Sequence, residues 1–412
     1  MAKKVICFAL GGHISTQNAS FRRLIELLEP RGYEFYGARN GFDCFRSGEV
    51  YRLSIENVPS CFAGFVCGSD RANILLKDGS LDPDMIQKAR DFFKRGNFDI
   101  AIGSGGDDHG KQIDILGKSL EGLVGYYVLN KTMDNDLGGK DGTNNCPYTD
   151  FTSGFHTAVS VGADTIRNHF SGAWTNDLPF IVGHFGREAN WVGTALTYYS
   201  NSDLFIYGEL PKDSKGHAIE KIHDTILLAQ EKNERIYGRR FAMVVVSEGT
   251  LVSGVDHLSE DLIDPHGHYK LNPEVLVIKL KETLEKKFKM KTHTAGITYE
   301  MRNFPPTTFD SRLARMSADE IAKSILIGQN GVESCFKING SHFSDISAGV
   351  APILKVSEKR YASFYETHQK RQFFNRDTFE VTDEIGKYYE ALFGKRKPLL
   401  DVLPKKMTLV RI

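Results

Sequence analysis

Short apolar runs alternate with longer amphipathic stretches along this chain, and most of the runs end at a glycine or a polar residue. The runs are mostly apolar and indicate buried strands. Because helical stretches separate the runs, the pattern predicts open α/β lobes with mainly parallel sheets covered by helices. The predicted strands span residues 5–10, 99–103, 122–129, 180–184, 204–207 and 242–246.

The stretches between these runs carry helix signals. Residues 21–28 predict a helix after the first strand, and Asn272 with Pro273 forms a good N-cap and first-turn pair for a later one. Apolar residues then recur every four positions and predict a packing face at Leu276, Leu280, Leu284 and Phe288. Aromatic and apolar residues within 388–393 predict a C-terminal helix that packs on the body of the protein or on a partner subunit.

Composition and charge narrow the class of protein. The 412 residues are 41% hydrophobic and carry 52 basic and 52 acidic side chains, so the formal net charge is zero and no general attraction to nucleic acid or to an anionic membrane is expected. No apolar run approaches the ~18 residues of a transmembrane helix, and the start of the chain lacks a secretory signal. The six cysteines form no Cys-x-x-Cys pair, which favours buried thiols in a cytoplasmic protein over a zinc site or a disulfide framework.

Ligands of such sheets bind beyond the carboxyl ends of the strands, which directs attention to the loops that follow the apolar runs. After the second predicted strand, Gly105 and Gly106 would let the backbone approach a phosphate closely, and Asp107 could hold Mg²⁺. A tight turn with solvated aspartates explains this segment equally well when it is taken alone. Gly11 and Gly12 end the first strand in a similar way.

A second polar cluster follows the third predicted strand. Asp134 and Asp136 point the same way on an extended segment, beside Lys131 and Thr132. One carboxylate could accept a proton from a hydroxyl group while the lysine neutralises a transferring phosphoryl group. A calcium loop is disfavoured, because Asn145 stands where that loop needs a bidentate glutamate. Arg187, after the fourth strand, becomes a phosphate ligand only if these loops converge on it.

Taken in order, these segments resemble the phosphofructokinase family. The resemblance runs from about residue 5 to about residue 331. One matching motif would be weak evidence for the family, but many motifs in the same order are strong evidence. The matching segments are residues 36–42, 67–71, 105–108, 131–136, 153–158, 186–187 and 246–249. The resemblance implies two Rossmann-like lobes with the active-site cleft between them.

The resemblance also implies a role for each matching residue. Asp134 would be the catalytic base, Asp107 would hold Mg²⁺, and Thr132 and Asp136 would line the sugar and phosphoryl region. The phosphoryl donor would contact Gly12, Arg71, Asp107, Asp108 and Lys131. The sugar phosphate would contact Thr132, Met133, Asp134, Asp136, Phe185, Gly186, Arg187, Glu209, Tyr299, Glu300, Met301 and Arg302.

Two positions bear on the donor. In this family, glycines usually stand at the positions of Asp108 and Lys131 when ATP is the donor, and Asp and Lys are typical of the pyrophosphate-using branch. Asp108 would place bulk and negative charge where the α-phosphate of ATP must lie. Lys131 would stabilise the departing phosphate of pyrophosphate.

The chain also departs from the family pattern. Ser15 and Thr16 replace a usual Pro-Gly pair in the first phosphate loop. Leu178 and His293 stand where two arginines usually grip the distal phosphate of the sugar, often across a subunit interface. Arg302 still offers one anchor, but the acceptor could differ from fructose 6-phosphate.

The expected protein is therefore a Mg²⁺- and pyrophosphate-dependent phosphofructokinase that phosphorylates the 1-hydroxyl of fructose 6-phosphate reversibly, as a homodimer or homotetramer. Two alternatives remain: a pyrophosphate-dependent kinase of another sugar phosphate such as sedoheptulose 7-phosphate, and a catalytically silent, ligand-binding subunit of a hetero-oligomer. The expected domains are a donor lobe of residues 1–147 plus about 303–340, a sugar-phosphate lobe of residues 148–302, and an extension of residues 341–412.

Overall fold

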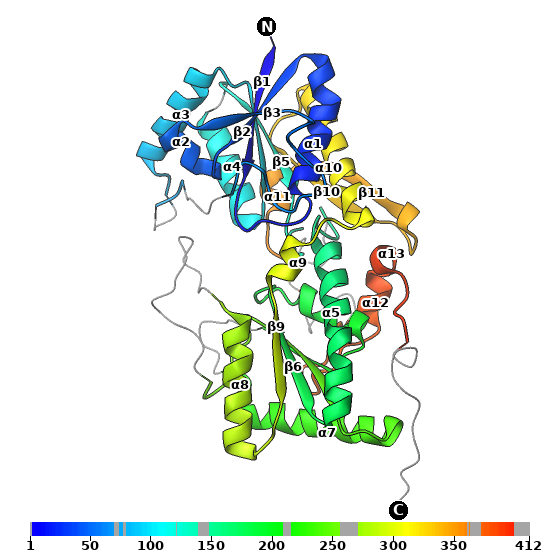
Figure 1. Ribbon diagram of the computed structural model, residues 1–412. Helices are drawn as coiled ribbons and strands as arrows, with labels where there is room; N and C mark the ends of the chain where they lie inside the picture. The colour runs from blue at the N-terminus through cyan, green and yellow to red at the C-terminus, as the bar shows by residue number, and fades with distance from the viewer. Residues whose placement is uncertain are drawn as a thin grey trace, which may run out of the picture.

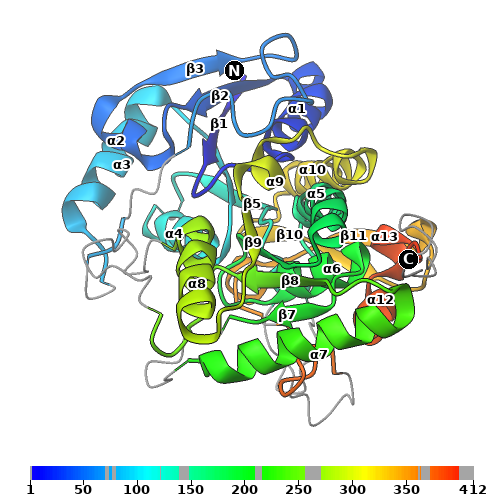
Figure 2. The ribbon, with the colours of Figure 1, turned by 60° about the horizontal axis from the view of Figure 1, so that its bottom comes forward.

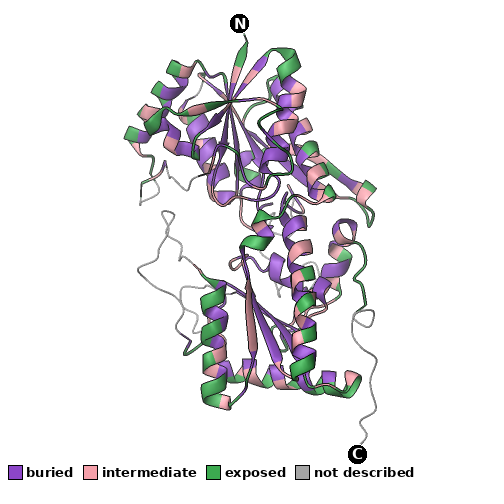
Figure 3. Cartoon of the chain, in the orientation of Figure 1, coloured by how far each residue is buried: buried purple, intermediate pink, exposed green. Residues whose placement is uncertain are grey.

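The structure is a computed structural model that describes residues 2–69, 74–76, 80–120, 122–138, 148–208, 216–255, 271–360, 362 and 372–398. Within these residues the chain forms two sheets, one of seven strands and one of four, and each is covered by helices (Figures 1 and 2). The central strands are buried in the interior of their lobes, whereas several edge strands are partly exposed and the outer helix faces are exposed (Figure 3). This arrangement confirms the predicted α/β class with two lobes.

The larger sheet has a parallel centre and antiparallel edges. Its strand order is β11-β10-β5-β4-β1-β2-β3, in which only β3 and β11 run antiparallel to their neighbours. The bounds are β1 (Lys3–Ala9), β2 (Tyr33–Ala38), β3 (Val50–Leu53), β4 (Ile100–Gly105), β5 (Gly125–Asn130), β10 (Val332–Ile338) and β11 (Ile346–Pro352). The predicted strand at 122–129 therefore begins three residues later than expected.

The burial of β1 explains why its sequence is continuously apolar. Val5 and Cys7 pack with α1 (Gln17–Leu28) and α10 (Thr308–Ile327) on one face, whereas Ile6 and Phe8 pack with α3 (Pro83–Gly96) and α4 (Asp107–Ser119) on the other. Alternate side chains thus enter two separate cores, and neither face of the strand meets water. The shorter helices of this lobe are η1 (Glu29–Arg31), η2 (Gly41–Asp43), α2 (Cys44–Ser47) and α11 (Ile353–Val356).

The smaller sheet is parallel throughout, in the order β7-β8-β6-β9. Its strands are β6 (Pro179–His184), β7 (Leu204–Ile206), β8 (Ala242–Ser247) and β9 (His293–Ile297). Its helices are α5 (Phe155–Asn176), α6 (Trp191–Ser200), α7 (Ile219–Tyr237), α8 (Pro273–Phe288) and α9 (Tyr299–Asn303). The N-cap predicted for α8 is confirmed, because the side chain of Asn272 accepts hydrogen bonds from the backbone N–H groups of Glu274 and Val275 at 3.0 and 3.3 Å.

The C-terminal part of the chain joins both lobes. β11 forms an edge of the larger sheet, although residues 341–412 were expected as an extension. η3 (Phe343–Asp345) precedes this strand, and the predicted C-terminal helix is present as two short helices, α12 (Glu384–Tyr388) and α13 (Glu390–Phe393). α12 packs against α6, and α13 against α5, so this segment lies along the smaller lobe (Figure 1).

Two features bear on the environment of the protein. None of the helices in the described residues is both long and apolar enough to cross a membrane. The cysteines that the structure describes are free thiols, of which Cys61 is exposed and the other four are buried.

A buried carboxylate fastens the first turn of α5 to α10. Asp310 is fully buried and accepts hydrogen bonds from the N–H groups of Gly154 and Thr157, at 3.0 and 2.7 Å, and from the hydroxyl of Thr157 at 2.6 Å. A negative side chain is favourable at a helix N-terminus, where backbone N–H groups lack partners within the helix. Because β10 follows α10 and β6 follows α5, this contact fixes how the two lobes meet.

We expect Asp310→Ala to lower the free energy of unfolding by about 3 kcal/mol or more, because it leaves the N–H groups of Gly154 and Thr157 buried without their acceptor. Asn272→Ala is the matched control, since it removes an exposed cap and should cost only about 1 kcal/mol. Urea denaturation of both variants measures the difference. Equal losses would contradict the role given to Asp310.

Candidate active site

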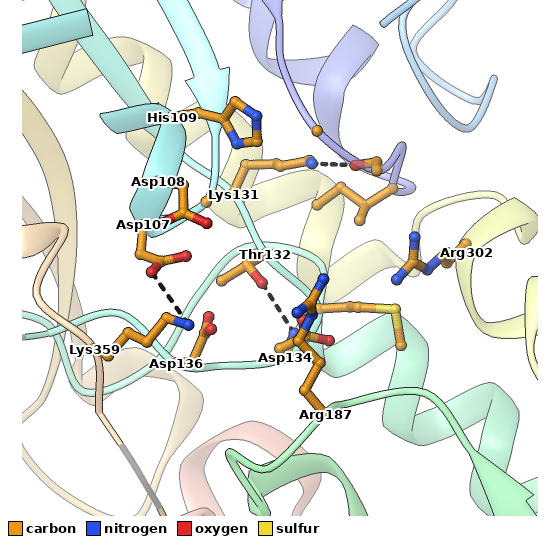
Figure 4. Close-up of a pocket in the computed structure, with 15 residues that line it drawn as sticks. Asp107, Asp108, His109, Lys131, Thr132, Asp134, Asp136, Arg187, Arg302 and Lys359 are labelled. Carbon is orange, nitrogen blue, oxygen red and sulfur yellow. Dashed lines mark hydrogen bonds and ion pairs between the residues drawn. The ribbon is translucent and has the colours of Figure 1, made fainter. Parts of the chain in front are cut away.

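The carboxyl ends of strands from both sheets meet at one pocket of about 700 Å³, which includes the open solvent at its mouth. The larger lobe contributes the loops after β1, β4 and β5, and the smaller lobe contributes the loop after β6 and helix α9 (Figure 4). The lining residues are Gly11, Gly12, Ile14, Gly106, Asp107, Asp108, His109, Lys131, Thr132, Met133, Asp134, Asp136, Arg187, Arg302 and Lys359.

The first turn of α4 supplies three of these side chains. β4 ends at Gly105, Gly106 is extended, and α4 begins at Asp107, so Asp107 and Asp108 lie at a helix N-terminus that favours negative charge. Burial raises the pKa of Asp107, the neighbouring charge of Asp108 raises it further, and Lys359 opposes both. The turn therefore holds two carboxylates where charge is costly without a cation nearby.

His109 closes one wall of the pocket. A Cβ atom at Gly11 would lie 2.7 Å from Cε1 of His109, and the φ angle of Gly11 is +76°, so only glycine lets this loop pass the imidazole ring. His109 is buried, and its position in the pocket was not predicted. A signal was present, since a histidine followed two aspartates directly after a glycine-rich strand end.

The loop after β5 carries Asp134 and Asp136. The N–H of Asp134 donates to Oγ1 of Thr132 at 3.1 Å, and Asn135 between the two carboxylates has a φ angle of +57°. Asp134 and Asp136 both line the pocket. Burial raises the pKa of Asp136 well above its ordinary value, and the charges of Asp107 and Asp134 raise it further.

Lys131 stands beneath the first glycine loop. Its side chain is buried, and Nζ donates to the carbonyl oxygen of Gly12 and lies 3.5 Å from that of Leu10. The ammonium group therefore connects the loop after β5 with the loop after β1 (Figure 4). A cation in this place faces the same pocket as Asp108.

A buried glutamate shapes the turn that presents Arg187. Gly186 and Arg187 have φ angles of +140° and +48°, an unfavourable region for arginine. Oε1 of Glu248 accepts hydrogen bonds from the N–H groups of both residues at 3.1 and 3.0 Å, and the hydroxyl of Ser247 donates to the carbonyl of Arg187. Glu248 lies in a matching family motif, yet no site role was predicted for it.

Arg302 reaches the pocket from α9. Its guanidinium lies over the ring of Phe185 at 4.6 Å. A Cβ atom at Gly12 would lie 2.4 Å from Nη1 of Arg302, so the arginine of the smaller lobe touches the phosphate loop of the larger one. Arg302 is therefore the side chain that spans the two sides of the cleft.

The structure brings most of the predicted residues together. Ten of them line the pocket: Gly12, Asp107, Asp108, Lys131, Thr132, Met133, Asp134, Asp136, Arg187 and Arg302. Two further predicted residues lie beside the pocket: Phe185 contacts Arg302, and Gly186 precedes Arg187. The predicted residues outside its lining on α9 are Tyr299 and Glu300, which are exposed, and Met301, which is buried in the core. Arg71 and Glu209 lie outside the described residues.

The acidic residues of the pocket fit a divalent cation only in part. In the described residues, Oδ2 of Asp107, Oδ1 of Asp134 and Oδ1 of Asp136 are buried without a hydrogen-bond partner, as expected of oxygens that await a cation. Those same residues contain no set of three His, Cys, Asp or Glu side chains placed to enclose a metal. A hard cation would therefore need further oxygens from a bound phosphate group.

Lys359 is the other pocket residue that was not predicted. It follows α11, its Nζ lies 3.6 Å from Oδ2 of Asp107, and no motif marked this part of the sequence. Burial lowers the pKa of Lys359, but the surrounding carboxylates, led by Asp107 and Asp136, raise it above its ordinary value.

The pocket belongs to a chain with many relatives. The sequence profile of the family "Phosphofructokinase" matches residues 4–325. The pyrophosphate–fructose 6-phosphate 1-phosphotransferase of Dictyoglomus thermophilum is 24% identical over 89% of this chain and 97% of its own length. The ATP-dependent 6-phosphofructokinase of Paenibacillus macquariensis is also 24% identical, over 80% of this chain and 87% of its own.

Solved structures share the fold. The crystal structure of a pyrophosphate-dependent phosphofructokinase from Marinobacter aquaeolei superposes with a TM-score of 0.73, over 98% of this chain and 95% of the other, at 18% identity. The arrangement of the two sheets and the cleft is therefore that of phosphofructokinases.

Glu248 should make stability depend on pH. Burial, followed by the charge of Asp134, raises its pKa from 4.5 to about 7. Between these pH values the unfolded chain loses the proton that the folded chain keeps. The stability that this raised pKa of Glu248 contributes to the folded state is therefore complete below pH 4.5, and it is lost as the pH rises through 7. At about 1.4 kcal/mol per pKa unit the loss is about 3 kcal/mol.

Glu248→Gln keeps the acceptor oxygen but cannot titrate in this range. We expect the free energy of unfolding of the wild type, relative to this variant, to fall by up to about 3 kcal/mol between pH 4.5 and 8. Urea denaturation at several pH values measures it. Parallel profiles for the two proteins would show that the pKa of Glu248 is not raised.

Proposed function

The chain belongs to the phosphofructokinase family, and from this premise we propose that it transfers a phosphoryl group from inorganic pyrophosphate to the 1-hydroxyl of fructose 6-phosphate. The products are fructose 1,6-bisphosphate and phosphate. One observation carries the proposal: Asp134 lies in a single pocket with Gly12, Asp107 and Lys131 of the larger lobe and with Arg187 and Arg302 of the smaller lobe. That arrangement suits a base placed between a donor anion and an acceptor anion.

The donor side supports pyrophosphate over ATP. Asp108 lines the pocket with a carboxylate, which would repel the α-phosphate of a nucleotide and occupy its space. Lys131, held under the carbonyl of Gly12, would neutralise the phosphate that leaves. The names of relatives include both pyrophosphate- and ATP-dependent enzymes, so the donor rests on these two side chains.

The acceptor side supplies the base and the anchors. Oδ1 of Asp134 is buried without a hydrogen-bond partner among the described residues, so it is available to a substrate hydroxyl. Asp134 takes the proton of the 1-hydroxyl as that oxygen bonds to the transferring phosphorus and the bond to the leaving phosphate breaks. Arg187 and Arg302 attract the sugar phosphate and fix its orientation. In the reverse direction Asp134 returns the proton.

Enzymes of this family generally need a divalent metal ion, and we propose that it is Mg²⁺. Asp107, whose buried Oδ2 accepts no hydrogen bond from the described residues, would hold it together with oxygens of the donor. When bound, the ion supplies positive charge that offsets the negative charge of the phosphates.

Enzymes of this family are oligomeric, and we propose a cytoplasmic homodimer or homotetramer here. Leu178 directly precedes β6 and His293 begins β9, so both lie at the ends of the smaller sheet opposite to Arg187. A six-residue strand spans about 20 Å, so neither residue reaches the pocket of its own chain. If they meet a sugar phosphate, it is in a second copy.

A second candidate function is a pyrophosphate-dependent kinase of another sugar phosphate. Leu178 favours it, because an apolar side chain stands where the family usually offers an arginine to the distal phosphate. Sedoheptulose 7-phosphate is such an acceptor. Comparing kcat/KM for the two sugars with pyrophosphate as donor decides between them.

We expect Asp134→Asn to fold normally and to lose activity by about 10²–10⁴-fold in kcat, because an amide of nearly the same shape cannot take the hydroxyl proton. Steady-state assays with pyrophosphate, Mg²⁺ and fructose 6-phosphate measure the loss. The KM values should change little. Near-native turnover would mean that Asp134 is not the base.

The donor assignment is tested by assaying the wild type with pyrophosphate and with ATP, and then the Asp108→Gly and Lys131→Gly variants. Asp108→Gly should raise the ratio of kcat/KM for ATP to that for pyrophosphate, since bulk and charge both leave the site. Lys131→Gly should lower the pyrophosphate reaction by about 10²-fold or more, because the leaving phosphate loses its cation.

The double variant should favour ATP more than the two single effects combined if both residues act on one phosphate site. A wild type that prefers ATP, or a donor ratio that Asp108→Gly leaves unchanged, would refute pyrophosphate as the donor. A wild type without turnover on either donor would instead support a silent subunit.

A further inference from the structure

A lysine from the C-terminal part of the chain reaches the acidic end of the pocket. Nζ of Lys359 lies 3.6 Å from Oδ2 of Asp107, and Figure 4 shows the side chain directed towards Asp107 and Asp136. About a quarter of the side chain is exposed, and it lines the pocket. A ligand in the pocket can therefore meet this ammonium group.

The backbone of this segment is fixed to the loop that carries Asp134 and Asp136. Lys359 pairs with Leu137 in an isolated β-bridge, and the N–H of Arg360 donates to the carbonyl of Asp136 at 2.7 Å. Nη2 of Arg360 donates to the carbonyl of Asn135 at 2.9 Å. Lys359 therefore enters the pocket from a rigid base.

Arg360 also contacts residues of the smaller lobe. Its guanidinium lies over the ring of Trp191 at 4.2 Å, and Nε1 of Trp191 donates to the carbonyl of Arg360 at 3.3 Å. Nη1 of Arg360 donates to the carbonyl of Asp150 at 2.7 Å. Arg360 is buried, so these contacts fasten the backbone next to Lys359.

Lys359 faces two carboxylates of the pocket. Oδ2 of Asp107 and Oδ1 of Asp136 are buried and, among the described residues, accept no hydrogen bond. The separation of 3.6 Å between Lys359 and Asp107 is an ion pair longer than an ordinary hydrogen bond. The ammonium group thus balances the charge of these oxygens without saturating them.

We propose that Lys359 has two successive roles: it is the resident counter-cation of Asp107 and Asp136 before ligands bind, and it becomes a ligand of the pyrophosphate once a metal ion takes over the carboxylates. The second role rests on the proposed function, whereas the first does not. A lysine suits both roles because its ammonium is a compact charge on a flexible stem, which can turn from a carboxylate to a phosphate.

The two roles have opposite consequences for metal and for donor. In the ligand-free protein Lys359 competes with a divalent cation for the carboxylates, so removing its charge should strengthen metal binding. With the metal in place it attracts the donor, so removing its charge should weaken pyrophosphate binding. If Lys359 only stabilised the fold, removing its charge would neither strengthen metal binding nor weaken pyrophosphate binding.

Lys111 provides the matched control. Its Nζ lies 3.9 Å from the same oxygen of Asp107, but the side chain is more exposed than that of Lys359 and does not line the pocket. A general loss of positive charge near Asp107 would affect metal binding in Lys111→Met and Lys359→Met alike. A role specific to the pocket would appear in Lys359→Met alone.

The experiment compares the full-length wild type with Lys359→Met, Lys359→Gln and Lys111→Met. Two neutral replacements keep the test valid if one of them folds poorly, which thermal melting in the absence of ligands reveals. The first measurement is Mn²⁺ binding without pyrophosphate, by calorimetry. We expect the Lys359 variants to bind Mn²⁺ at least about fivefold more tightly than the wild type and Lys111→Met.

The second measurement is pyrophosphate binding at saturating Mg²⁺, also by calorimetry. We expect the Lys359 variants to bind pyrophosphate about tenfold or more weakly, with Lys111→Met unchanged. The KM for the sugar phosphate should stay within about twofold in all the variants, because Lys359 pairs with Asp107, on the donor side, and the anchors of the sugar phosphate are Arg187 and Arg302.

Unchanged or weaker Mn²⁺ binding in the Lys359 variants overturns the counter-cation role. Unchanged pyrophosphate binding in a protein that uses pyrophosphate overturns the donor role. If the wild type does not bind or use pyrophosphate, the proposed function fails, and the Mn²⁺ measurement still decides the first role.

Discussion

Four carboxylates crowd together at the ends of β4 and β5, and the rest of this site depends on how their charge is balanced. Asp107 and Asp108 begin α4, and Asp134 and Asp136 follow β5, so adjacent parallel strands deliver all four to one pocket. Buried negative charge is costly unless it is paired. The raised pKa values of Asp107 and Asp136, caused first by burial, express this cost.

The fold offsets this negative charge by placing basic side chains from several segments of the chain in the same pocket. Lys131 comes from the loop after β5, and Arg187 and Arg302 come from the smaller lobe. Lys359 comes from the segment after β11. Each is held by contacts of its own, such as Glu248 behind Arg187, so the charge balance of the pocket depends on how the two lobes and the C-terminal segment are joined.

The sequence predicted what local patterns encode. Predicted strands such as β1 and β8 are apolar runs buried on both faces, and an N-cap such as Asn272 forms within its own helix, so these features were readable along the chain. β10 and β11 were not predicted, because β10 buries Glu333 and Ser334 among its apolar residues and β11 is an edge strand of small, partly exposed residues. Lys359 and His109 acquire their positions from packing between distant segments, and a lysine in a loop has no pattern that distinguishes it from a solvated one.

The placement of the cations gives a physical reason for a compact donor. Nζ of Lys131 lies at the carbonyl of Gly12 and Nζ of Lys359 lies beside Asp107, so a ligand that extends from Asp107 towards the loop after β1 meets positive charge at both ends (Figure 4). Pyrophosphate carries charge at both of its ends and can use both cations. A nucleotide adds an α-phosphate beyond the two phosphates that the lysines can pair with, and the negative charge of this group would face the carboxylate of Asp108. Discrimination against the nucleotide then follows from repulsion in the wrong complex as much as from attraction in the right one.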